Sequence, residues 1–368
     1  MATNAAAAEP VTPKSSVASD FYERLHALQM IGLWEMYGEY SKVVKNGLLD
    51  EPPYMWRWRD YYPLLLESGS IGIDSDLFQR PEQARGGVER RNLVMYPTGN
   101  PAGATCTTMA CGVQYIKPGE TAPCHRHDPA AIRFIIEGRG AYTAVEGEKF
   151  HMEPGDLILT PRWTWHEHGN DGNEPVIWMD GLDSPFVLNY LHADFWQPYR
   201  DGYFPQAHAE GHTRRRLGNG FVRPMKRIAE RALPVIYPWS EVYPELIRQR
   251  DAAENVDPYD GVILEYVNPV SGGPTLPTMS CRMQLIPAGQ STQTHRHTAR
   301  AIYRVFKGSG WSEVGGHRIE WEAGDVFCLP IWTWHSHGAN RGEDAILFTM
   351  CDQPLLEPFD LYQEEARQ

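Results

Sequence analysis

The residues of this 368-residue chain best suited to chemistry are histidines that occur in two matched sets. Each set begins with a His-x-His pair and ends with a third histidine about 40 residues later: His125, His127 and His166, then His295, His297 and His335. Alternate residues of a strand face the same side, so both members of a His-x-His pair can point into one interior. Three imidazole ligands leave coordination positions open, which indicates a catalytic metal rather than a structural one.

The two histidine sets lie in segments that repeat each other. Residues 107–127 align without a gap to residues 277–297, and residues 155–170 align to residues 324–340 with one inserted residue. Short strand-like runs punctuated by Gly, Pro, Asn and Asp surround both sets. The sequence therefore predicts a duplicated all-β unit of about 100 residues, each copy a small barrel or jelly roll whose closure protects its strand edges.

Changes of composition along the chain predict its domain limits. Apolar residues recur at helical spacing from 20 to 44, and further helices are expected near 61–66 and over 240–253. The predicted segments are a flexible arm (1–18), a helical N-terminal region (19–85), the first β unit (86–195), a connector with a helix (196–255), the second β unit (256–356) and a C-terminal tail (357–368).

Charge and composition exclude several classes of function. The formal net charge is −13, from 34 Lys plus Arg against 47 Asp plus Glu, which argues against nucleic acid as a partner. No run of about 18 apolar residues predicts a membrane span, and the N-terminus lacks the pattern of a secretory signal. Six scattered cysteines do not suggest a disulfide framework. We therefore expect a cytoplasmic protein without a membrane partner.

The histidine segments resemble the paired motifs of the cupin superfamily. The pattern Gly119-x5-His125-x-His127, followed by Gly155-x5-Pro161 and His166-x3-Asn170, carries the resemblance, and its two copies resemble a bicupin. This implies an all-β fold of two double-stranded β-helix (jelly-roll) barrels with helical N-terminal and connecting segments. Cupins usually have a carboxylate ligand four residues after the second histidine, whereas Ala131 and Ala301 stand there in this chain. Because of this departure from the cupin pattern, each site is expected to have histidines as its only protein ligands.

A narrower resemblance covers nearly the whole chain. HRH-x5-R-x3-EG (125–138), WTWHEHGN (163–170), WMDGLD (178–183) and GGVERRNLVMYP (86–97) are similar to the gentisate 1,2-dioxygenase family and its salicylate and 1-hydroxy-2-naphthoate relatives. The resemblance implies Fe(II) on the first histidine set, O2 as co-substrate and a small aromatic acid as substrate. The ring of gentisate (2,5-dihydroxybenzoate) or a close ortho-hydroxybenzoate would open between its carboxyl- and hydroxyl-bearing carbons, giving maleylpyruvate or an analogue. The family resemblance also implies a homo-oligomer, commonly a tetramer.

The same resemblance assigns further residues by position. Arg133 and Arg90 match arginines that meet the substrate carboxylate, a role that suits the paired donors of a guanidinium. His168 would hold or move the phenolic proton as a catalytic group, and Asp180 would orient these groups. The neighbouring Arg91 is expected to be structural or to face solvent.

Small and aromatic residues complete the expected substrate pocket. Gln114, Ala110 and Gly112 lie on the strand before the metal motif and could floor it, with the two small residues leaving room for a ring. Trp163 is a candidate ring contact. The placement of Trp163 and Trp165 in one copy and Trp332 and Trp334 in the other equally fits core packing.

The second copy departs from the first around its histidines. Tyr303 replaces Arg133, and Thr349 falls near the place of Asp180. We therefore expect a second metal site that turns over substrate poorly. Three alternatives remain open at this level: a dioxygenase for substituted salicylate or 1-hydroxy-2-naphthoate, a Zn- or Mn-dependent isomerase or hydrolase, and a non-catalytic bicupin that binds a small anion.

Overall fold

The computed structural model describes residues 23–24, 26–27, 53–70, 91–97, 104–193, 195–200, 202–218, 234–252 and 256–367. Contacts divide the chain into two units, Met1–Asp50 and Glu51–Gln368, and every element named below belongs to the second. The predictions for Arg90, for the arm at 1–18 and for most of the helix at 20–44 lie outside the described residues.

The first barrel consists of two antiparallel sheets, with strand orders β12-β8-β5-β10-β3-β2 and β11-β4-β9-β6-β7. Strands β3, β6 and β8 are buried along their whole length, because one face of each packs into the barrel and the other against neighbouring elements. The strands are β2 (Arg91–Met95), β3 (Ala110–Ile116), β4 (Thr121–His127), β5 (Ala131–Glu137), β6 (Ala141–Val145), β7 (Glu148–His151), β8 (Leu157–Thr160), β9 (His166–Asn170), β10 (Val176–Leu182), β11 (Trp196–Pro198) and β12 (Ile236–Tyr237).

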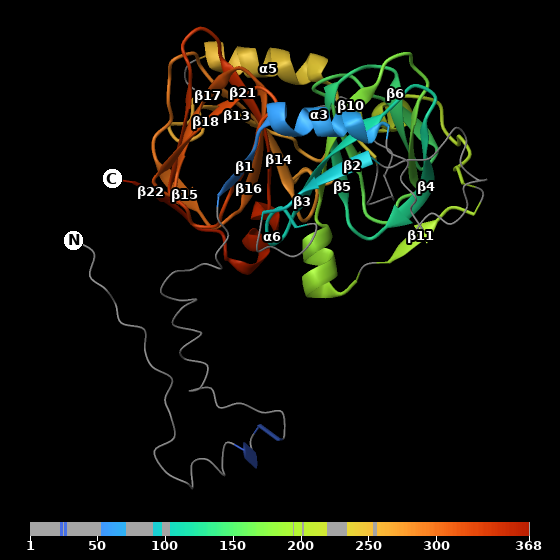
Figure 1. The fold of residues 1–368 in the computed structure, drawn as a ribbon, viewed down its shortest axis with the longest axis horizontal. Helices are drawn as coiled ribbons and strands as arrows, with labels where there is room; N and C mark the ends of the chain where they lie inside the picture. The colour runs from blue at the N-terminus through green and yellow to red at the C-terminus, as the bar shows by residue number, and fades with distance from the viewer. Residues whose placement is uncertain are drawn as a thin grey trace. The chain divides into compact units, whose positions relative to one another are not determined.

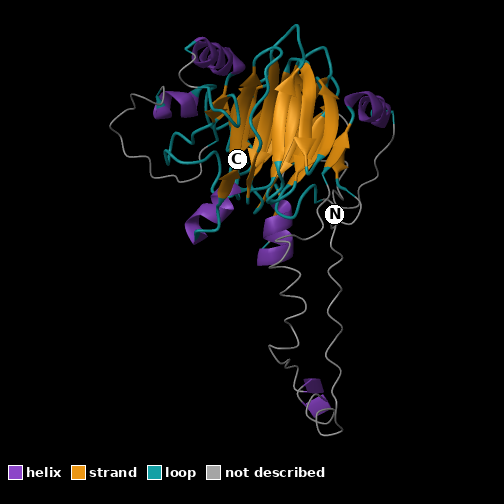
Figure 2. Ribbon diagram, turned by 90° about the vertical axis from the view of Figure 1, so that its left-hand side faces the viewer, coloured by secondary structure: helices purple, strands orange, loops and turns teal. Residues whose placement is uncertain are grey.

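The second barrel repeats this arrangement, with strand orders β1-β19-β16-β21-β14-β13 and β18-β17-β20-β15-β22. Its strands are β1 (Tyr54–Trp56), β13 (Val262–Glu265), β14 (Ser280–Ile286), β15 (His295–His297), β16 (Ala301–Lys307), β17 (Ser309–Val314), β18 (His317–Glu322), β19 (Val326–Leu329), β20 (His335–Ala339), β21 (Ala345–Cys351) and β22 (Glu364–Ala366). The duplicated all-β fold predicted from the sequence is confirmed, and helices lie outside the strands (Figure 2).

Among the described residues of the second unit, six short helical segments lie outside the strands. The predicted helices near 61–66 and over 240–253 correspond to α3 and α5. The segments are α3 (Trp58–Ser68), the π-helix η3 (Phe186–Leu191), α4 (His212–Leu217), α5 (Trp239–Asp251), α6 (Gln353–Leu356) and the 3-10 helix η4 (Glu357–Phe359).

Each barrel is preceded in the sequence by a strand and a helix, and that strand pairs with the other barrel. Strand β1, which comes before the first barrel, pairs with β19 of the second, whereas β12 pairs with β8 of the first. The helix that follows each strand is anchored in the same way: Asp325 accepts the N–H of Trp58 at 2.8 Å, and Asp156 accepts the N–H of Trp239 at 2.8 Å. Helices α3 and α5 consequently lie across both barrels (Figure 1).

One apolar cluster joins the barrels, and a separate cluster fills each interior. Because neighbouring residues of a strand face opposite sides, Phe134 of β5 and Phe348 of β21 point into the shared cluster, where their rings stack at 4.2 Å. Trp178 of β10 points instead into the first barrel. Interior-facing residues of the strands are therefore the ones available to build a site.

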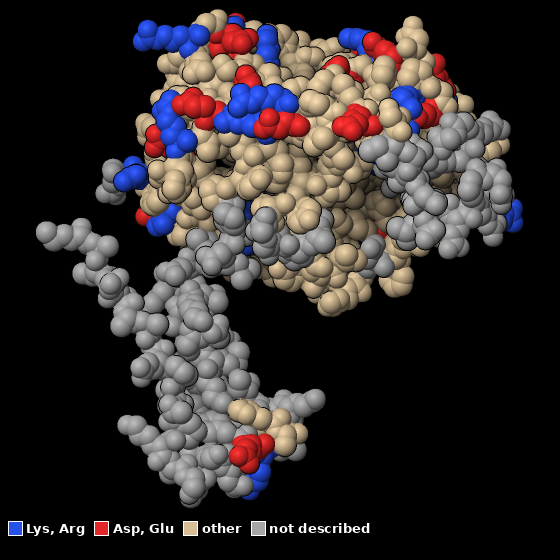
Figure 3. Space-filling view, viewed as in Figure 1, with Lys and Arg blue, Asp and Glu red and all other residues tan. Residues whose placement is uncertain are grey.

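The surface carries charges of both signs. On the face drawn in Figure 3, described Lys and Arg side chains are interspersed with Asp and Glu rather than gathered into one patch. Among the helices that the structure describes, none has the length and apolar character to cross a membrane.

Candidate metal centre and its surroundings

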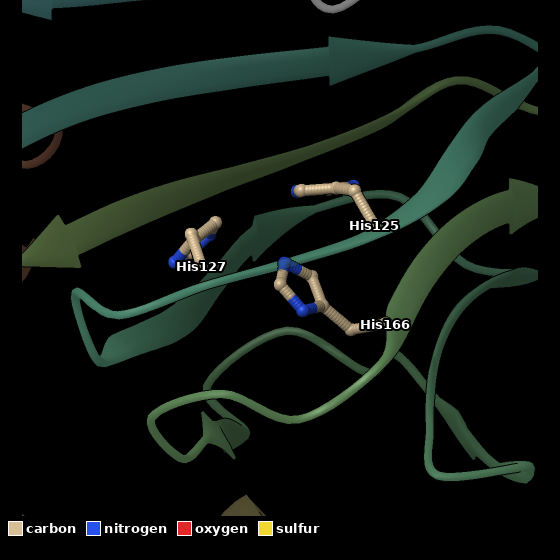
Figure 4. Close-up of side chains that lie close together, drawn as sticks. All are labelled: His125, His127 and His166. Carbon is tan, nitrogen blue, oxygen red and sulfur yellow. The ribbon is translucent and has the colours of Figure 1, made fainter. Parts of the chain in front are cut away.

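The first three histidines converge in the first barrel, and we call them the first cup. Strand β4 carries His125 and His127, and β9 carries His166, so that one ligand atom from each lies within 4.8 Å of the others. The ring centroids are 4.2 Å apart for His125 and His166, 4.8 Å for His127 and His166, and 5.4 Å for His125 and His127. The three rings lie close together between the strands (Figure 4).

The backbone fixes the orientation of each ring in the first cup. The Nδ1 atoms of His125, His127 and His166 lie 2.9, 2.7 and 2.9 Å from the carbonyl oxygens of residues 123, 129 and 164. Each Nδ1 can therefore donate a hydrogen bond, which leaves Nε2 to bind a ligand.

His166 of the first cup has the protonation state that a metal requires. The Nε2 atom of His166 is buried without a hydrogen-bond partner, a costly arrangement unless a ligand completes it. Burial, followed by repulsion from His125 and His127, lowers the pKa of His166 well below its ordinary value. The neutral imidazole is the form that coordinates a metal. This donor set fits a divalent transition-metal ion with open coordination positions.

A row of three residues lies beside the first cup on adjacent strands. Asp180 of β10 lies opposite Arg133 of β5 on one side and Gly112 of β3 on the other. The Arg133 Nε atom lies 3.5 Å from Asp180 Oδ1 and is buried without a hydrogen-bond partner, while another guanidinium nitrogen donates to Thr160. Burial lowers the pKa of Arg133, and the Asp180 carboxylate opposes this shift. A buried cation with an unused donor suits an anionic ligand.

Asn92, which was not predicted from the sequence as a site residue, helps to hold Asp180. Asp180 accepts hydrogen bonds from the Trp178 indole N–H at 2.9 Å and from Asn92 Nδ2 at 3.0 Å. A Cβ atom built on Gly112 would lie 2.1 Å from Asn92 Oδ1. Asn92 thus occupies the space that we expected Gly112 to leave for a substrate ring, and that expectation is wrong. The alternation of residues in β2 was the available signal, but the contact depends on the pairing of β2 with β3, which sets Asn92 opposite Gln114 so that its side chain reaches the neighbouring Gly112.

His168 and Gln114 also belong to the interior of the first barrel. His168 is buried on the same face of β9 as His166, and its Nδ1 atom lies 3.0 Å from the hydroxyl of Thr143. Gln114 is buried on the face of β3 that also carries Ala110 and Gly112, because the intervening residues of β3 point into the cluster between the barrels.

The expectation that Arg91 is structural is confirmed, whereas the expectation for Trp163 needs correction. Arg91 is buried and forms a two-pronged ion pair with Glu120, at 2.5 and 2.7 Å, so it is structural and does not face solvent. Trp163 was expected to contact substrate or to pack in the core, yet 37% of it is exposed and its ring stacks on the Arg126 guanidinium at 4.4 Å. Arg126 lies between two ligand histidines of β4, so alternation turns it and Trp163 away from the first cup.

The second cup, formed by His295, His297 and His335, reproduces the histidine geometry. One ligand atom from each lies within 4.8 Å of the others, and the ring centroids are 4.2 to 5.6 Å apart. In the matching row Thr349 lies opposite Tyr303, as Asp180 lies opposite Arg133. The other neighbour of Thr349 is Arg282, at the position of Gly112. An arginine is therefore present in the second row, on a different strand.

Comparison with known proteins extends the similarity to both barrels. The cupin domain model matches residues 112–182 and 282–351. The chain is 37% identical to a 5-aminosalicylate 1,2-dioxygenase of Comamonas sp, over 94% of this chain and 89% of that protein. It is 38% identical to a 1-hydroxy-2-naphthoate 1,2-dioxygenase of Nocardioides sp. (strain KP7), over 97% and 89%, and 35% identical to a gentisate 1,2-dioxygenase of Haloferax sp, over 90% and 92%.

A solved structure has the same architecture. The salicylate 1,2-dioxygenase of Pseudaminobacter salicylatoxidans superposes with a TM-score of 0.81 at 28% identity, covering 96% of this chain and 99% of that one. A structure of that enzyme with gentisate gives a TM-score of 0.83, also at 28% identity, over 97% and 96%.

Proposed function

The chain belongs to the gentisate 1,2-dioxygenase family of bicupin ring-cleaving dioxygenases, and from this membership we propose that it opens the ring of gentisate or a close ortho-hydroxybenzoate. The bond cleaved joins the carboxyl-bearing and hydroxyl-bearing carbons. With gentisate, insertion of both atoms of O2 gives the ring-opened dicarboxylic acid maleylpyruvate. Family membership favours this enzymatic function over the non-catalytic anion-binding alternative.

The observation that carries the proposal is the first cup with Arg133 beside it. Three neutral imidazoles would hold Fe(II), and the metal would supply chelation of the substrate's carboxylate and phenolate oxygens together with activation of O2. A dianionic substrate suits this site because the three histidine ligands contribute no negative charge. His125, His127 and His166 are the ligands in this proposal.

The row next to the first cup binds and orients the substrate. The guanidinium of Arg133 donates to the substrate carboxylate, and Asp180 fixes the guanidinium while it is itself held by Trp178 and Asn92. Arg90 is proposed as a second anchor by its position in the sequence alone. Gln114 and Ala110 floor the pocket.

His168 is proposed to handle the phenolic proton. Its ring lies 6.2 Å from that of His166 and 5.3 Å from the Trp178 ring, and Thr143 fixes its Nδ1 atom. The opposite nitrogen, Nε2, is then the atom that accepts the proton when the hydroxybenzoate binds as the dianion. The proton then passes from His168 to solvent as the ring-opened dicarboxylate is released, and the site returns to its starting state.

The substrate panel that tests this function follows from the relatives. They include enzymes named for 5-aminosalicylate, 1-hydroxy-2-naphthoate and gentisate at 30–38% identity. Enzyme loaded anaerobically with Fe(II) is mixed with gentisate, salicylate, 5-aminosalicylate, 5-nitrosalicylate or 1-hydroxy-2-naphthoate, and O2 uptake is measured with product absorbance. We expect one O2 consumed per ring opened, with gentisate among the substrates. Turnover with Zn(II) and no O2 uptake would instead establish an isomerase or hydrolase.

Two accompanying proposals concern the state of the protein. We propose a homotetramer, which light scattering after gel filtration tests by its mass. We also propose a cytoplasmic location, supported by the six cysteines, which are all buried and form no disulfide within the described part of the chain.

A further inference from the structure

The second cup differs from the first in the strand that covers it. Strand β22, near the C-terminus, pairs antiparallel with β15, placing Glu364 opposite His297 and Ala366 opposite His295. Further backbone hydrogen bonds extend this pairing at both ends. In the first barrel, β11 covers β4 in the same way, but its three residues, Trp196–Pro198, include no carboxylate.

The strand β22 supplies a side chain to the second cup. Glu364 Oε1 lies 3.0 Å from His295 Nδ1. The Nδ1 atoms of His297 and His335 meet backbone carbonyl oxygens at 2.8 and 2.9 Å, as do all three histidines of the first cup. Of the six cup histidines, His295 is therefore the one whose Nδ1 faces a carboxylate. Such a partner orients the ring and raises the basicity of the metal-binding nitrogen.

The nitrogen atoms that would bind the metal are available in the second cup. The Nε2 atoms of His295 and His335 are buried without a hydrogen-bond partner. Both residues are about 1% exposed, so water does not satisfy these atoms from outside. A metal ion would satisfy both atoms at once.

The charges around the second cup favour a cation over an anionic substrate. The partly buried Asp260 interacts electrostatically with His295 and with Arg282. Together with Glu364, it gives two carboxylates for one guanidinium. Arg282 also donates a hydrogen bond to Gln353, and Tyr303 stands where the first barrel has its anchoring arginine. Asp260 offsets part of the Arg282 charge and Gln353 already accepts from one of its donors, so Arg282 is less available than Arg133 to hold a substrate carboxylate.

We propose that the second cup is a resident site for a divalent transition-metal cation, locked by the C-terminal strand through Glu364. Three imidazoles suit Zn(II), Fe(II) or Co(II). The bound ion ties β15, β20 and β22 together, so metal binding and docking of the C-terminal strand stabilise each other. This inference does not rest on the proposed ring cleavage, which occurs in the first cup.

Cobalt(II) is the probe for the test because its visible absorption reports histidine ligation. The first cup is disabled by His125→Ala and His127→Ala, and the second cup is titrated with Co(II) in competition with a chelator. We expect Glu364→Gln to raise the dissociation constant roughly 10- to 100-fold. The matched control is Glu365→Gln, because Glu365 lies on the same strand but pairs with Arg296. Its dissociation constant stays within about twofold.

Equal effects of the two substitutions, or no Co(II) bound to the second cup at all, would overturn the proposal. Hydrogen exchange on the unmodified protein provides a measurement that requires no variant. Amides of residues 361–367 should exchange at least about tenfold faster after chelation and recover when metal is restored. Unchanged exchange would show that the ion does not hold the strand, even if the ion binds.

Discussion

The burial of Arg133 gives this residue its chemical role. The guanidinium is 4% exposed and is stabilised by its ion pair with Asp180, and a ligand carboxylate that accepts further hydrogen bonds from it would stabilise the buried charge more. The arginine fork matches a carboxylate in geometry as well as in charge. Substitution of Arg133 should therefore affect the substrate far more than the metal.

We expect Arg133→Ala to lower kcat/KM by about 100-fold or more, because a buried charge-assisted hydrogen-bond pair contributes roughly 3 kcal/mol. Arg133→Lys keeps the charge but loses the fork, so its loss should be smaller yet still near tenfold. Steady-state kinetics with gentisate or the best substrate of the panel measures both variants, and the iron content of each serves as the control. A variant that loses iron along with activity would assign Arg133 to the metal site instead.

The contact of the Asn92 side chain with Gly112 predicts an energetic coupling. Asn92→Ala removes a hydrogen bond to Asp180, and Gly112→Ala displaces the Asn92 side chain by the contact of its new Cβ atom. Each change should lower kcat/KM about 3- to 10-fold, or about 1 kcal/mol, by loosening Asp180. The double variant should lose no more than the more damaging single variant, since both act on one contact. Full additivity in the kinetic double-mutant cycle would show that Gly112 acts independently of Asn92.

At the scale of elements, two equivalent Gly-Asp turns fasten the exchanged helices. Asp156 and Asp325 each accept the first N–H of a helix that begins with tryptophan. A Cβ atom on Gly155 or Gly324 would lie 2.6 or 2.4 Å from that tryptophan ring, and both glycines have positive φ angles. Each turn therefore requires glycine for two reasons: its φ angle is positive, and the tryptophan ring leaves no room for a side chain.

Asp156 makes stability depend on pH. Burial raises its pKa from 3.8 to about 6, against the hydrogen bond from the Trp239 backbone. The folded chain thus keeps a proton that the unfolded chain loses, and the free energy of unfolding falls as pH rises from about 4 to about 6, by up to roughly 3 kcal/mol. Asp156→Asn should remove most of this decrease, as urea unfolding at pH 4.5 and 7 can measure. Asp171→Asn, at an exposed site, should leave it unchanged.

At the scale of the whole molecule, local patterns predicted most of the fold. The duplicated all-β unit, both histidine trios and the places of Tyr303 and Thr349 relative to Arg133 and Asp180 follow from alternation and from the repeat. These features depend on spacing along one strand or on comparison of two copies. Sequence spacing carries that information directly.

The features that could not be predicted depend on which distant segments pair. The exchange of β1 and β12 between barrels reverses the order expected from sequence proximity. The position of Asn92 at Gly112, the approach of Glu364 to His295 and the outward stacking of Trp163 on Arg126 are likewise set by tertiary register. Such contacts leave no periodic trace in a single sequence.

The two cups have similar histidines but different surroundings, so we expect the first cup to carry out turnover and the second cup to stabilise the fold. His127→Ala is expected to abolish O2 uptake, a loss of at least about 1000-fold, because the first cup would lose its metal next to Arg133. The double variant His295→Ala and His297→Ala should reduce kcat less than about threefold, because Tyr303 stands in the second barrel where Arg133 anchors the substrate in the first. It should lower the metal content and Tm, because metal bound in the second cup stabilises the fold. Iron analysis, O2 electrode traces and thermal melts of both variants test the division. Complete inactivation of the second variant with iron still in the first cup would contradict it, and would mean that turnover requires both barrels.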